Sequence, residues 1–259
     1  MLNLEEIKKF FPPTLHRFDR FLLREYLQYK ILEIVFKSAF ASKLCFIGGT
    51  CLRIVHNNNR FSEDLDFDNF DLEKNEFEKI ANKIENELKL DGFEVEVRKV
   101  YKGAYHCYIK FPNILFQSGL SGHQEEKILI RLDREAQHFT FKPNTYIINK
   151  MGIFTSILTT PIDILLSQKL LTIMQRPRPK GRDFFDVSFL LPRTKPNFLF
   201  IEEKMGIIDP HELKAVILDK CRSIDFEEMA EDVRSFLFKK EDENRVLLFV
   251  PYFQQIDLS

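Results

Sequence analysis

Residues 46–68 read FIGGTCLRIVHNNNRFSEDLDFD, and this stretch indicates a strand, a helix and a second strand in close succession. The apolar run at 43–47 predicts a buried strand that a pair of glycines ends. Residues 50–56 favour a short helix, which three asparagines then break. Residues 64–67 predict the next strand. Because alternate residues of a strand point to the same face, Asp64 and Asp66 should share one face of it.

Two carboxylates on one strand face repel each other, and a divalent cation relieves that repulsion. Mg²⁺ prefers hard oxygen ligands and usually binds through one or two carboxylates together with substrate phosphates. Asp133 supplies a third carboxylate at the end of a predicted strand. Gly48 and Gly49 permit close approach of the backbone to a ligand, and a helix that starts at Thr50 attracts anions. The pattern predicts two-metal phosphoryl chemistry on a nucleotide.

Composition places the chain among globular proteins. Hydrophobic residues make up 44% of the 259 residues and charged residues 30%. Lys plus Arg (38) nearly cancels Asp plus Glu (39), so a nucleic-acid partner would need a local basic patch. The four cysteines have no zinc-like spacing, and the sequence shows neither a signal peptide nor an apolar stretch long enough to span a bilayer. We expect a cytoplasmic protein with buried thiols and no membrane partner.

Periodicity changes from mixed to helical near residue 158, which predicts two domains. The expected helices are 3–11, 15–39, 50–56, 71–90, 161–175, 182–192, 211–222 and 226–240, and the expected strands are 43–47, 64–67, 93–100, 105–111 and 127–133, with one more within 145–157. The prediction is an α+β fold. It has a mixed-sheet core with N-terminal helices at 1–158 and a helical C-terminal domain at 159–259.

A family resemblance adds to this reading. The segment GGTCLRIVHNNNRFSEDLDF resembles the GG[ST]–spacer–DxD signature of the DNA polymerase β-like nucleotidyltransferases. The order and spacing of its residues are similar to those of the AbiEii/AbiGii toxin family, relatives of the MenT toxins. Residues 169–191, KLLTIMQRPRPKGRDFFDVSFLL, are similar to the Lys-Leu motif of that family and to the Arg-Asp-x-x-Asp motif that follows it. The resemblance covers about residues 40 to 192 and implies a nucleotidyltransferase core.

The resemblance implies roles for individual residues of this chain. Gly48, Gly49 and Thr50 would cradle the triphosphate, and Arg60 and Ser62 would assist nucleotide binding. Asp64, Asp66 and Asp133 would hold Mg²⁺ and act in catalysis. Lys169 would contact the nucleotide phosphates, and Asp183 and Asp186 would form a second acidic catalytic motif with Arg182 beside them.

The implied activity is transfer of a nucleoside monophosphate from an NTP to an acceptor, with release of pyrophosphate. The expected acceptor is the 3′ end of tRNA, held by the basic loop RPRPKGR at 176–182, and the expected partner is a cognate antitoxin of a type IV system. Two other functions stay open: nucleotidyl transfer to a protein side chain, and a non-catalytic nucleotide- or antitoxin-binding module.

Structural interpretations compete with these roles. Arg60 and Ser62 can belong to a turn that orients the 64–67 strand, and Asp133 can be a surface residue paired with Arg131 or Arg134. Lys169 can be a helix lysine that extends to solvent. Asp183 and Asp186 can be helix-end charges, with Arg182 and Asp186 paired one helical turn apart. The loop at 176–182 can be a solvated linker, Asp68 a turn residue, and His56, His106, His123 and His138 ordinary surface or loop residues.

Overall fold

The computed structural model describes residues 1–102, 104–135 and 137–259, which form two compact units. Unit 1 comprises Met1–Cys51, Ser62–His138 and Lys142–Thr159 within those described limits. Unit 2 comprises Leu52–Phe61, Phe139–Phe141 and Thr160–Ser259. The short segment Leu52–Phe61 therefore groups with the C-terminal helices, although it precedes the DxD strand in the chain. The sheet in unit 1 and the helices in both units make the fold α+β, as predicted.

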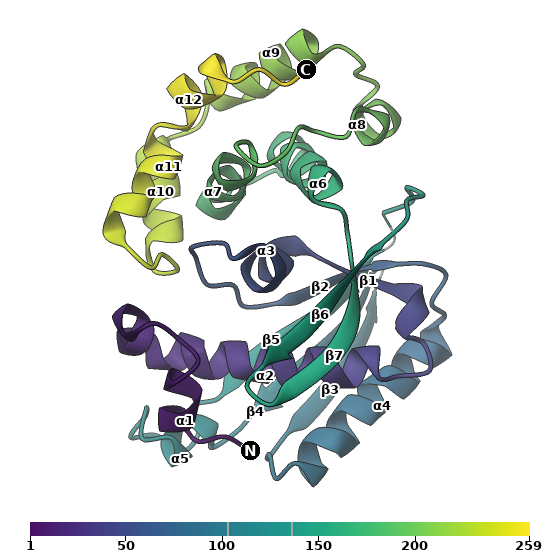
Figure 1. Ribbon diagram of the computed structural model, residues 1–259, viewed down its shortest axis with the longest axis vertical. Coiled ribbons are helices and arrows are strands. Elements are labelled where there is room, and N and C mark those ends of the chain that lie inside the picture. The colour runs from purple at the N-terminus through teal and green to yellow at the C-terminus, as the bar shows by residue number, and fades with distance from the viewer. Residues whose placement is uncertain (103, 136) are drawn as a thin grey trace. The chain divides into compact units, whose positions relative to one another are not determined.

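Unit 1 is built on one sheet, and seven strands of it lie within the described residues, in the order β3-β4-β5-β2-β1-β7-β6 (Figure 1). The strands are β1 (Leu44–Ile47), β2 (Leu65–Asn69), β3 (Glu96–Lys102), β4 (Ala104–Phe111), β5 (Ile128–Glu135), β6 (Asn144–Lys150) and β7 (Ile153–Thr159). The β2–β5 and β1–β7 pairs are parallel and the other four neighbouring pairs are antiparallel. The predicted mixed sheet is confirmed.

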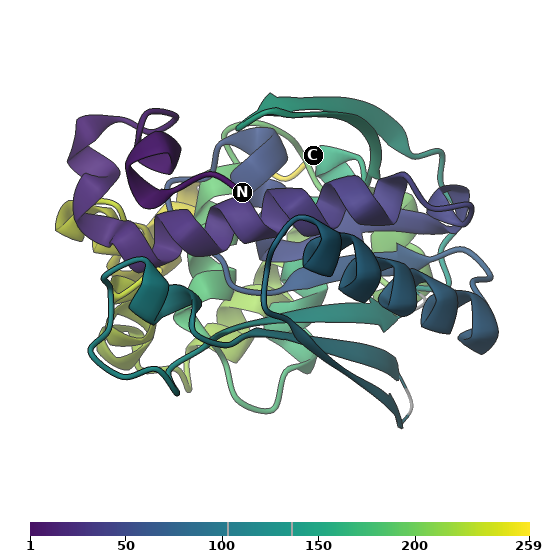
Figure 2. The ribbon, with the colours of Figure 1, turned by 90° about the horizontal axis from the view of Figure 1, so that it is seen from below.

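Two long helices, α2 (Asp19–Phe36) and α4 (Lys74–Leu90), lie along one face of this sheet (Figures 1 and 2). The buried residues of α4 recur at steps of three and four: Phe77, Ile80, Ala81, Ile84 and Leu88. That spacing puts them on one stripe of the helix, which packs against α2 and the strands β3 and β4. The shorter helices α1 (Leu4–Lys8) and α5 (Ile114–Gln117) complete unit 1, together with the 3₁₀ turns Pro13–Phe18 and Ala41–Lys43.

Unit 2 is helical. Its helices are α6 (Ile162–Gln175), α7 (Gly181–Leu190), α8 (Phe198–Met205), α9 (Pro210–Cys221), α10 (Phe226–Arg234), α11 (Asn244–Leu247) and α12 (Phe249–Gln255), with a 3₁₀ turn at Lys240–Glu243. Helix α7 packs against α6, α10, α11 and α12, and nearly all of its residues are buried (Figure 1). A Cβ atom on Gly181 would lie 1.8 Å from the carbonyl oxygen of Met229, so the first turn of α7 requires glycine to pack against α10.

The structure differs from the predicted elements in three places. Residues 144–159 form two strands instead of one, because Met151 and Gly152 both adopt positive φ (55° and 76°) and turn the chain back. That turn is usually built from Asn-Gly or Asp-Gly, so Met151 conceals it in the sequence. The second strand begins at Leu65, so Asp64 precedes it. Helices α5, α8, α11 and α12 have no counterpart in the prediction.

The described part of the chain contains no helix with the combined length and apolarity needed to cross a membrane.

Candidate active site

The sheet register brings together carboxylates from distant parts of unit 1. Asp66 on β2 pairs with Asp133 on the parallel strand β5, and Asp133 pairs in turn with His106 on β4. Directly opposed residues of neighbouring strands point to the same face of a sheet. Asp66, Asp133 and His106 therefore form one row across three strands.

Gly48 lies directly beside this row. It has a φ of +78° at the end of β1, and a Cβ atom built on it would lie only 2.3 Å from Oδ2 of Asp66. Any side chain at position 48 would therefore be strained and would also displace the Asp66 carboxylate. Gly48 thus leaves the space that the Asp66 carboxylate occupies, while Gly49 continues the first turn of α3 (Gly48–His56).

Thr50 and Ser62 support the loop that leads into β2. The hydroxyl of Thr50, which is fully buried, donates a hydrogen bond to the carbonyl oxygen of Asp64. The carbonyl oxygens of Ser62 and Glu63 accept hydrogen bonds from the side-chain amide of Gln28, at 3.0 and 2.9 Å. The Thr50 side chain thus holds Asp64 in place, and only the backbone of the helix start is left to meet a phosphate.

Arg131 bridges two of the predicted metal ligands. Its Nη2 lies 3.1 Å from Oδ2 of Asp64, and its Nε lies 2.6 Å from Oδ2 of Asp133. Burial acts to lower the pKa of Arg131, but the neighbouring carboxylates Asp64, Asp133 and Asp66 outweigh it and raise that pKa. Asp133 therefore does pair with Arg131, as the structural interpretation suggested. The other suggested partner, Arg134, has a side chain outside the described part of the structure.

His106 is a member of this cluster that sequence reasoning missed. Its Nδ1 lies 2.6 Å from Oδ1 of Asp133, and its side chain keeps 27% of its surface exposed. An ionised carboxylate can only accept, so the Nδ1–H tautomer donates to it. The alternation of polar and apolar residues at 105–111 places His106 on the face opposite the buried Cys107. Only the β4–β5 register shows that this face is the one with Asp133.

Asp68 is the third carboxylate of the alternation at 64–68, and its side chain accepts hydrogen bonds from backbone N–H groups. It is 1% exposed, and its Oδ1 accepts hydrogen bonds from the backbone N–H groups of Asn69 and Gln137, at 2.8 and 2.9 Å. It lies within β2, so the interpretation of Asp68 as a turn residue is wrong, because the strand runs two residues further than predicted.

The oxygen donors of Asp64, Asp66 and Asp133 suit Mg²⁺ in their chemistry. Among the described residues, however, no group of three or more His, Cys, Asp or Glu is arranged to hold a metal ion. Arg131 accounts for part of this, because its guanidinium takes one oxygen each from Asp64 and Asp133. Magnesium usually needs only one or two carboxylates beside phosphate and water, so the residues present fit that ion.

A second cluster of predicted site residues lies within unit 2 and centres on Asp186 of α7. Asp186 is fully buried and accepts two hydrogen bonds from Arg60, Nε to Oδ1 at 2.7 Å and Nη2 to Oδ2 at 2.6 Å. Asn58 donates to the same Oδ1 at 2.8 Å. Arg60 is itself only 2% exposed. Arg60 thus anchors the segment that precedes the DxD strand to α7, and its guanidinium is not presented to solvent.

Lys169 and Arg176 of α6 complete this ion-pair cluster. The Nζ of Lys169 lies 2.9 Å from Oδ2 of Asp186 and 3.2 Å from Oδ1 of Asp183, and Arg176 pairs with Asp183 at 2.5 Å. The Lys169 side chain is only 15% exposed, so its interpretation as a lysine that extends to solvent is wrong. Lys169 instead neutralises two carboxylates of α7.

Burial and neighbouring charges have opposite effects on the pKa values of Asp186 and Lys169. Burial acts to raise the pKa of Asp186, but Arg60 and Lys169 outweigh it and lower that pKa to about 2. Burial likewise acts to lower the pKa of Lys169, and the charges of Asp186 and Asp183 raise it. The suggested pair between Arg182 and Asp186 is wrong, because Asp186 faces Arg60 and Lys169 while Arg182 stacks on the ring of Phe236, 4.7 Å from its centroid.

The cations of the basic loop at 176–182 fall into two groups, those that pack within unit 2 and those that are exposed. Arg176 and Arg182 contribute to the packing of unit 2, whereas Arg178 and Lys180 are exposed. Within the described residues neither Arg178 nor Lys180 forms an ion pair. These two cations are therefore the part of the loop that can meet a partner.

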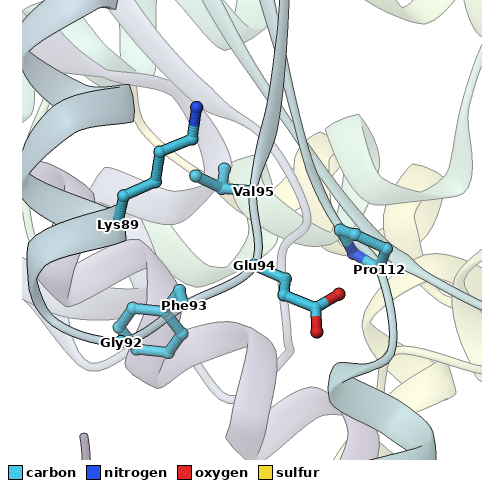
Figure 3. A pocket seen from close by; sticks show the side chains of 6 residues that line it. All are labelled: Lys89, Gly92, Phe93, Glu94, Val95 and Pro112. Atoms are coloured by element: carbon cyan, nitrogen blue, oxygen red, sulfur yellow. The ribbon is translucent and has the colours of Figure 1, made fainter.

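Two surface hollows lie apart from every predicted site residue. One of about 500 Å³ lies where α4 turns into β3, and Glu94 and Pro112 line one side of it (Figure 3). Glu94 already accepts a hydrogen bond from Asn113 at 2.7 Å. The other, of about 460 Å³, lies in unit 2 beside Asn197 and Ile208. Neither hollow contains a residue with a chemical role in the clusters above.

Two solved structures share this fold. One is JHP933 from Helicobacter pylori, with 18% identity and a TM-score of 0.55 over 91% of this chain and 90% of that one. The other is an H. pylori protein provisionally assigned as a nucleotidyltransferase, with 16% identity and a TM-score of 0.57 over 91% of this chain and 95% of that one. At such identities the similarity shows the fold alone. No curated protein matches the sequence.

The sequence itself carries a more specific match. The profile of a protein family described as "Nucleotidyl transferase AbiEii toxin, Type IV TA system" matches residues 30–251. That span includes the glycine pair, the DxD strand and helices α6 and α7, and it confirms the resemblance stated for the motifs. The chain therefore belongs to the AbiEii nucleotidyltransferase toxin family.

Proposed function

We propose that this chain transfers a nucleoside monophosphate from an NTP to the 3′ end of tRNA, with Mg²⁺ as cofactor. In that reaction the acceptor hydroxyl forms a bond to the α-phosphorus as the bond from that phosphorus to pyrophosphate breaks. Membership of the AbiEii family supports the transferase class and an antitoxin partner. We infer a cytoplasmic site of action, where NTPs and tRNA are available. The choice of tRNA, of Mg²⁺ and of a two-metal site is our extension.

The observation that carries the proposal is the register of β1, β2 and β5. It places the carboxylates of Asp66 and Asp133 on neighbouring strands, and Gly48 leaves room for Asp66 where the chain turns into α3. In the proposal Asp64, Asp66 and Asp133 hold the divalent cations. Bound there, the cations would neutralise charge on the phosphates and lower the pKa of the acceptor hydroxyl.

The nucleotide phosphates need cationic or N–H partners. The first turn of α3 offers the backbone N–H groups of Gly48, Gly49 and Thr50, which have no partner within the helix and carry its positive dipole end. Family resemblance assigns a phosphate contact to Lys169 as well. In unit 2 the three cations Arg60, Lys169 and Arg176 face the two carboxylates of Asp183 and Asp186, an excess of one positive charge that is compatible with an anionic ligand.

Arg60 and Asp186 have a supporting role in this proposal. Both are buried, so they hold the segment before the DxD strand and do not touch the substrate. The acceptor RNA requires a local cationic surface because the net charge of the chain is −1. Arg178 and Lys180 provide two exposed charges for the phosphate backbone.

Incubation of the purified protein with each of the four α-³²P-labelled NTPs, Mg²⁺ and total tRNA tests the proposal directly. We expect label in tRNA, removed by a 3′ exonuclease, and a stoichiometric release of pyrophosphate. A parallel reaction with cell lysate and ribonuclease detects a protein acceptor. Label in protein alone would replace the tRNA acceptor by a protein side chain. Absence of label from every fraction, with NTP still bound, would indicate a non-catalytic binding module.

A further inference from the structure

Arg131 lies between two acidic residues of the carboxylate cluster of unit 1. Its guanidinium contacts Oδ2 of Asp64 and Oδ2 of Asp133, the two predicted metal ligands that flank it. Asp64 directly precedes β2, and Asp133 lies within the part of β5 that pairs with β2. The guanidinium therefore links two carboxylates that are far apart in the chain, and Asp64 itself lies 67 positions before Arg131.

The side chain of Arg131 contributes little to the stability of the fold around it. Strand β5 is held by the buried Ile130 and Leu132, which lie on the opposite face, and by backbone pairing with β4 and β2. The Arg131 side chain is 40% exposed, so solvent screens its ion pairs. Ion pairs with such exposure are worth only about 0.2–1 kcal/mol each. The guanidinium can therefore be displaced at little cost to the fold.

A divalent cation would compete for the same oxygen atoms. The guanidinium donates a hydrogen bond to Asp64 and lies 2.6 Å from an oxygen of Asp133, so it occupies space that a metal bound to those oxygens would need, and a divalent cation would repel it. We propose that Arg131 is the counter-ion of the metal-free site: it keeps Asp64 and Asp133 together, and a divalent cation must displace it to bind. This inference rests on the proposed function, since it takes Asp64 and Asp133 as ligands.

The proposal predicts an effect whose sign a purely structural role would not produce. Removal of a supporting side chain normally loosens a site and weakens metal binding. Removal of a competing counter-ion strengthens it, because the carboxylates gain a partner only when the metal arrives. We expect Arg131→Gln to bind a divalent cation about tenfold more tightly than the wild type, the scale of one removed charge at close range in high dielectric.

The chain offers a matched control. Arg98 on β3 pairs with Tyr108 on β4, and Tyr108 pairs with Arg131, so the two arginines stand in one row of the sheet, two strands apart. Arg98 is exposed and contacts none of the three carboxylates. Arg98→Gln therefore removes the same charge and the same hydrogen-bonding group from the same sheet. Arg131→Lys keeps the charge and loses the two-pronged contact.

The experiment titrates Mg²⁺ and, separately, Mn²⁺ into each metal-free protein without nucleotide, by calorimetry, and records the melting temperature with and without metal. We expect tighter binding in Arg131→Gln alone, affinity near that of the wild type in Arg131→Lys, and no change in Arg98→Gln. Metal-free Arg131→Gln should melt a few degrees lower than the wild type, and saturating metal should abolish that difference. A wild type that binds no metal while Arg131→Gln binds it would also support the proposal.

Equal or weaker metal affinity in Arg131→Gln would overturn the inference, as would a failure of all four proteins to bind. The proposed function has its own readout, the dependence of nucleotidyl transfer by the wild type on added divalent cation. Metal-dependent transfer together with an unchanged affinity in Arg131→Gln would remove the counter-ion role and leave the transferase. Transfer that persists in a chelator would instead contradict the metal chemistry itself.

Discussion

Arg60 and Asp186, 126 positions apart in the chain, form a two-pronged ion pair in which both side chains are buried, 2% and 0% exposed. Removal of one partner from such a pair leaves an uncompensated charge in the interior, which costs about 3–5 kcal/mol. We expect each of Arg60→Leu and Asp186→Leu to lose stability on this scale in urea unfolding. The double variant should be more stable than either single variant, because Asp183 still pairs with Lys169 and Arg176.

Transfer activity of that double variant separates support from chemistry at Asp186. If the carboxylate only anchors Arg60, the folded double variant should transfer nucleotide at a measurable fraction of the wild-type rate. A folded but inactive double variant would show that the Arg60–Asp186 pair is needed for transfer beyond its contribution to stability. If the stability loss of the double variant equals the sum of the losses in the two single variants, the ion pair is not the source of the effect.

The lowered pKa of Asp186 predicts a specific acid response. Its pKa falls from 3.8 to about 2 in the folded chain, so its stabilising contribution is fully present above the unfolded value. That contribution, about 2 kcal/mol, should be lost as pH falls from about 4 towards 2. Unfolding free energies measured across this range should lose part of their slope in Asp186→Asn. Asp219→Asn, which alters an exposed pair with Arg222, should keep the wild-type slope.

Gly48→Ala tests the space that the Asp66 carboxylate occupies. The added Cβ would meet Oδ2 of Asp66 at 2.3 Å, so the carboxylate must move and nucleotidyl transfer should fall by at least about a hundredfold. Gly152→Ala is the matched control, because its φ of +76° imposes the same backbone strain and no atom lies within 4 Å of its Cβ. Both variants should lose about 1–2 kcal/mol of stability from that strain. Equal activities in the two variants would exclude a steric role for Gly48.

Asp66→Asn tests the proposed metal ligand without a change of shape. Loss of a negative ligand should reduce transfer about 10³-fold or more, since metal-based charge stabilisation would be lost. Stability should be retained, because Asp64, Asp66 and Asp133 repel one another in the absence of metal. Circular dichroism melts and transfer rates at saturating NTP provide the two measurements. Near-wild-type transfer by Asp66→Asn would rule out the proposed two-metal chemistry.

Arg178 and Lys180 test the RNA acceptor. Replacement of both by Gln should weaken tRNA labelling and reduce the slope of log affinity against log salt by about two phosphate contacts. NTP binding should be unchanged. Lys239→Gln with Lys240→Gln removes two exposed, adjacent cations of the same unit and serves as the control. An unchanged salt slope in the Arg178/Lys180 variant, or an equal loss in the control, would argue against this loop as the RNA contact.

Local sequence determined the individual elements and the candidate ligands of this protein. A period of two in residues 64–68 marks a strand with carboxylates on one face, and a period of three to four marks α2, α4 and α6, because these repeats follow from the geometry of each element alone. The glycine pair likewise indicates a close backbone approach, since only glycine adopts the conformation of Gly48 without strain.

Tertiary structure alone decided which of these residues meet. The pairing of Asp66 with Asp133, and of Asp133 with His106, depends on strand register, and a shift of one residue would turn each side chain to the other face. Sequence alone assigned Arg60 a substrate or turn role, because its partner Asp186 lies 126 positions further along the chain. Lys169 and Asp186 lie on different helices, and only the packing of α6 against α7 shows that they pair. Burial by α6, α7 and α10 then made those charges pair with one another, because an isolated charge in the interior is too costly to keep.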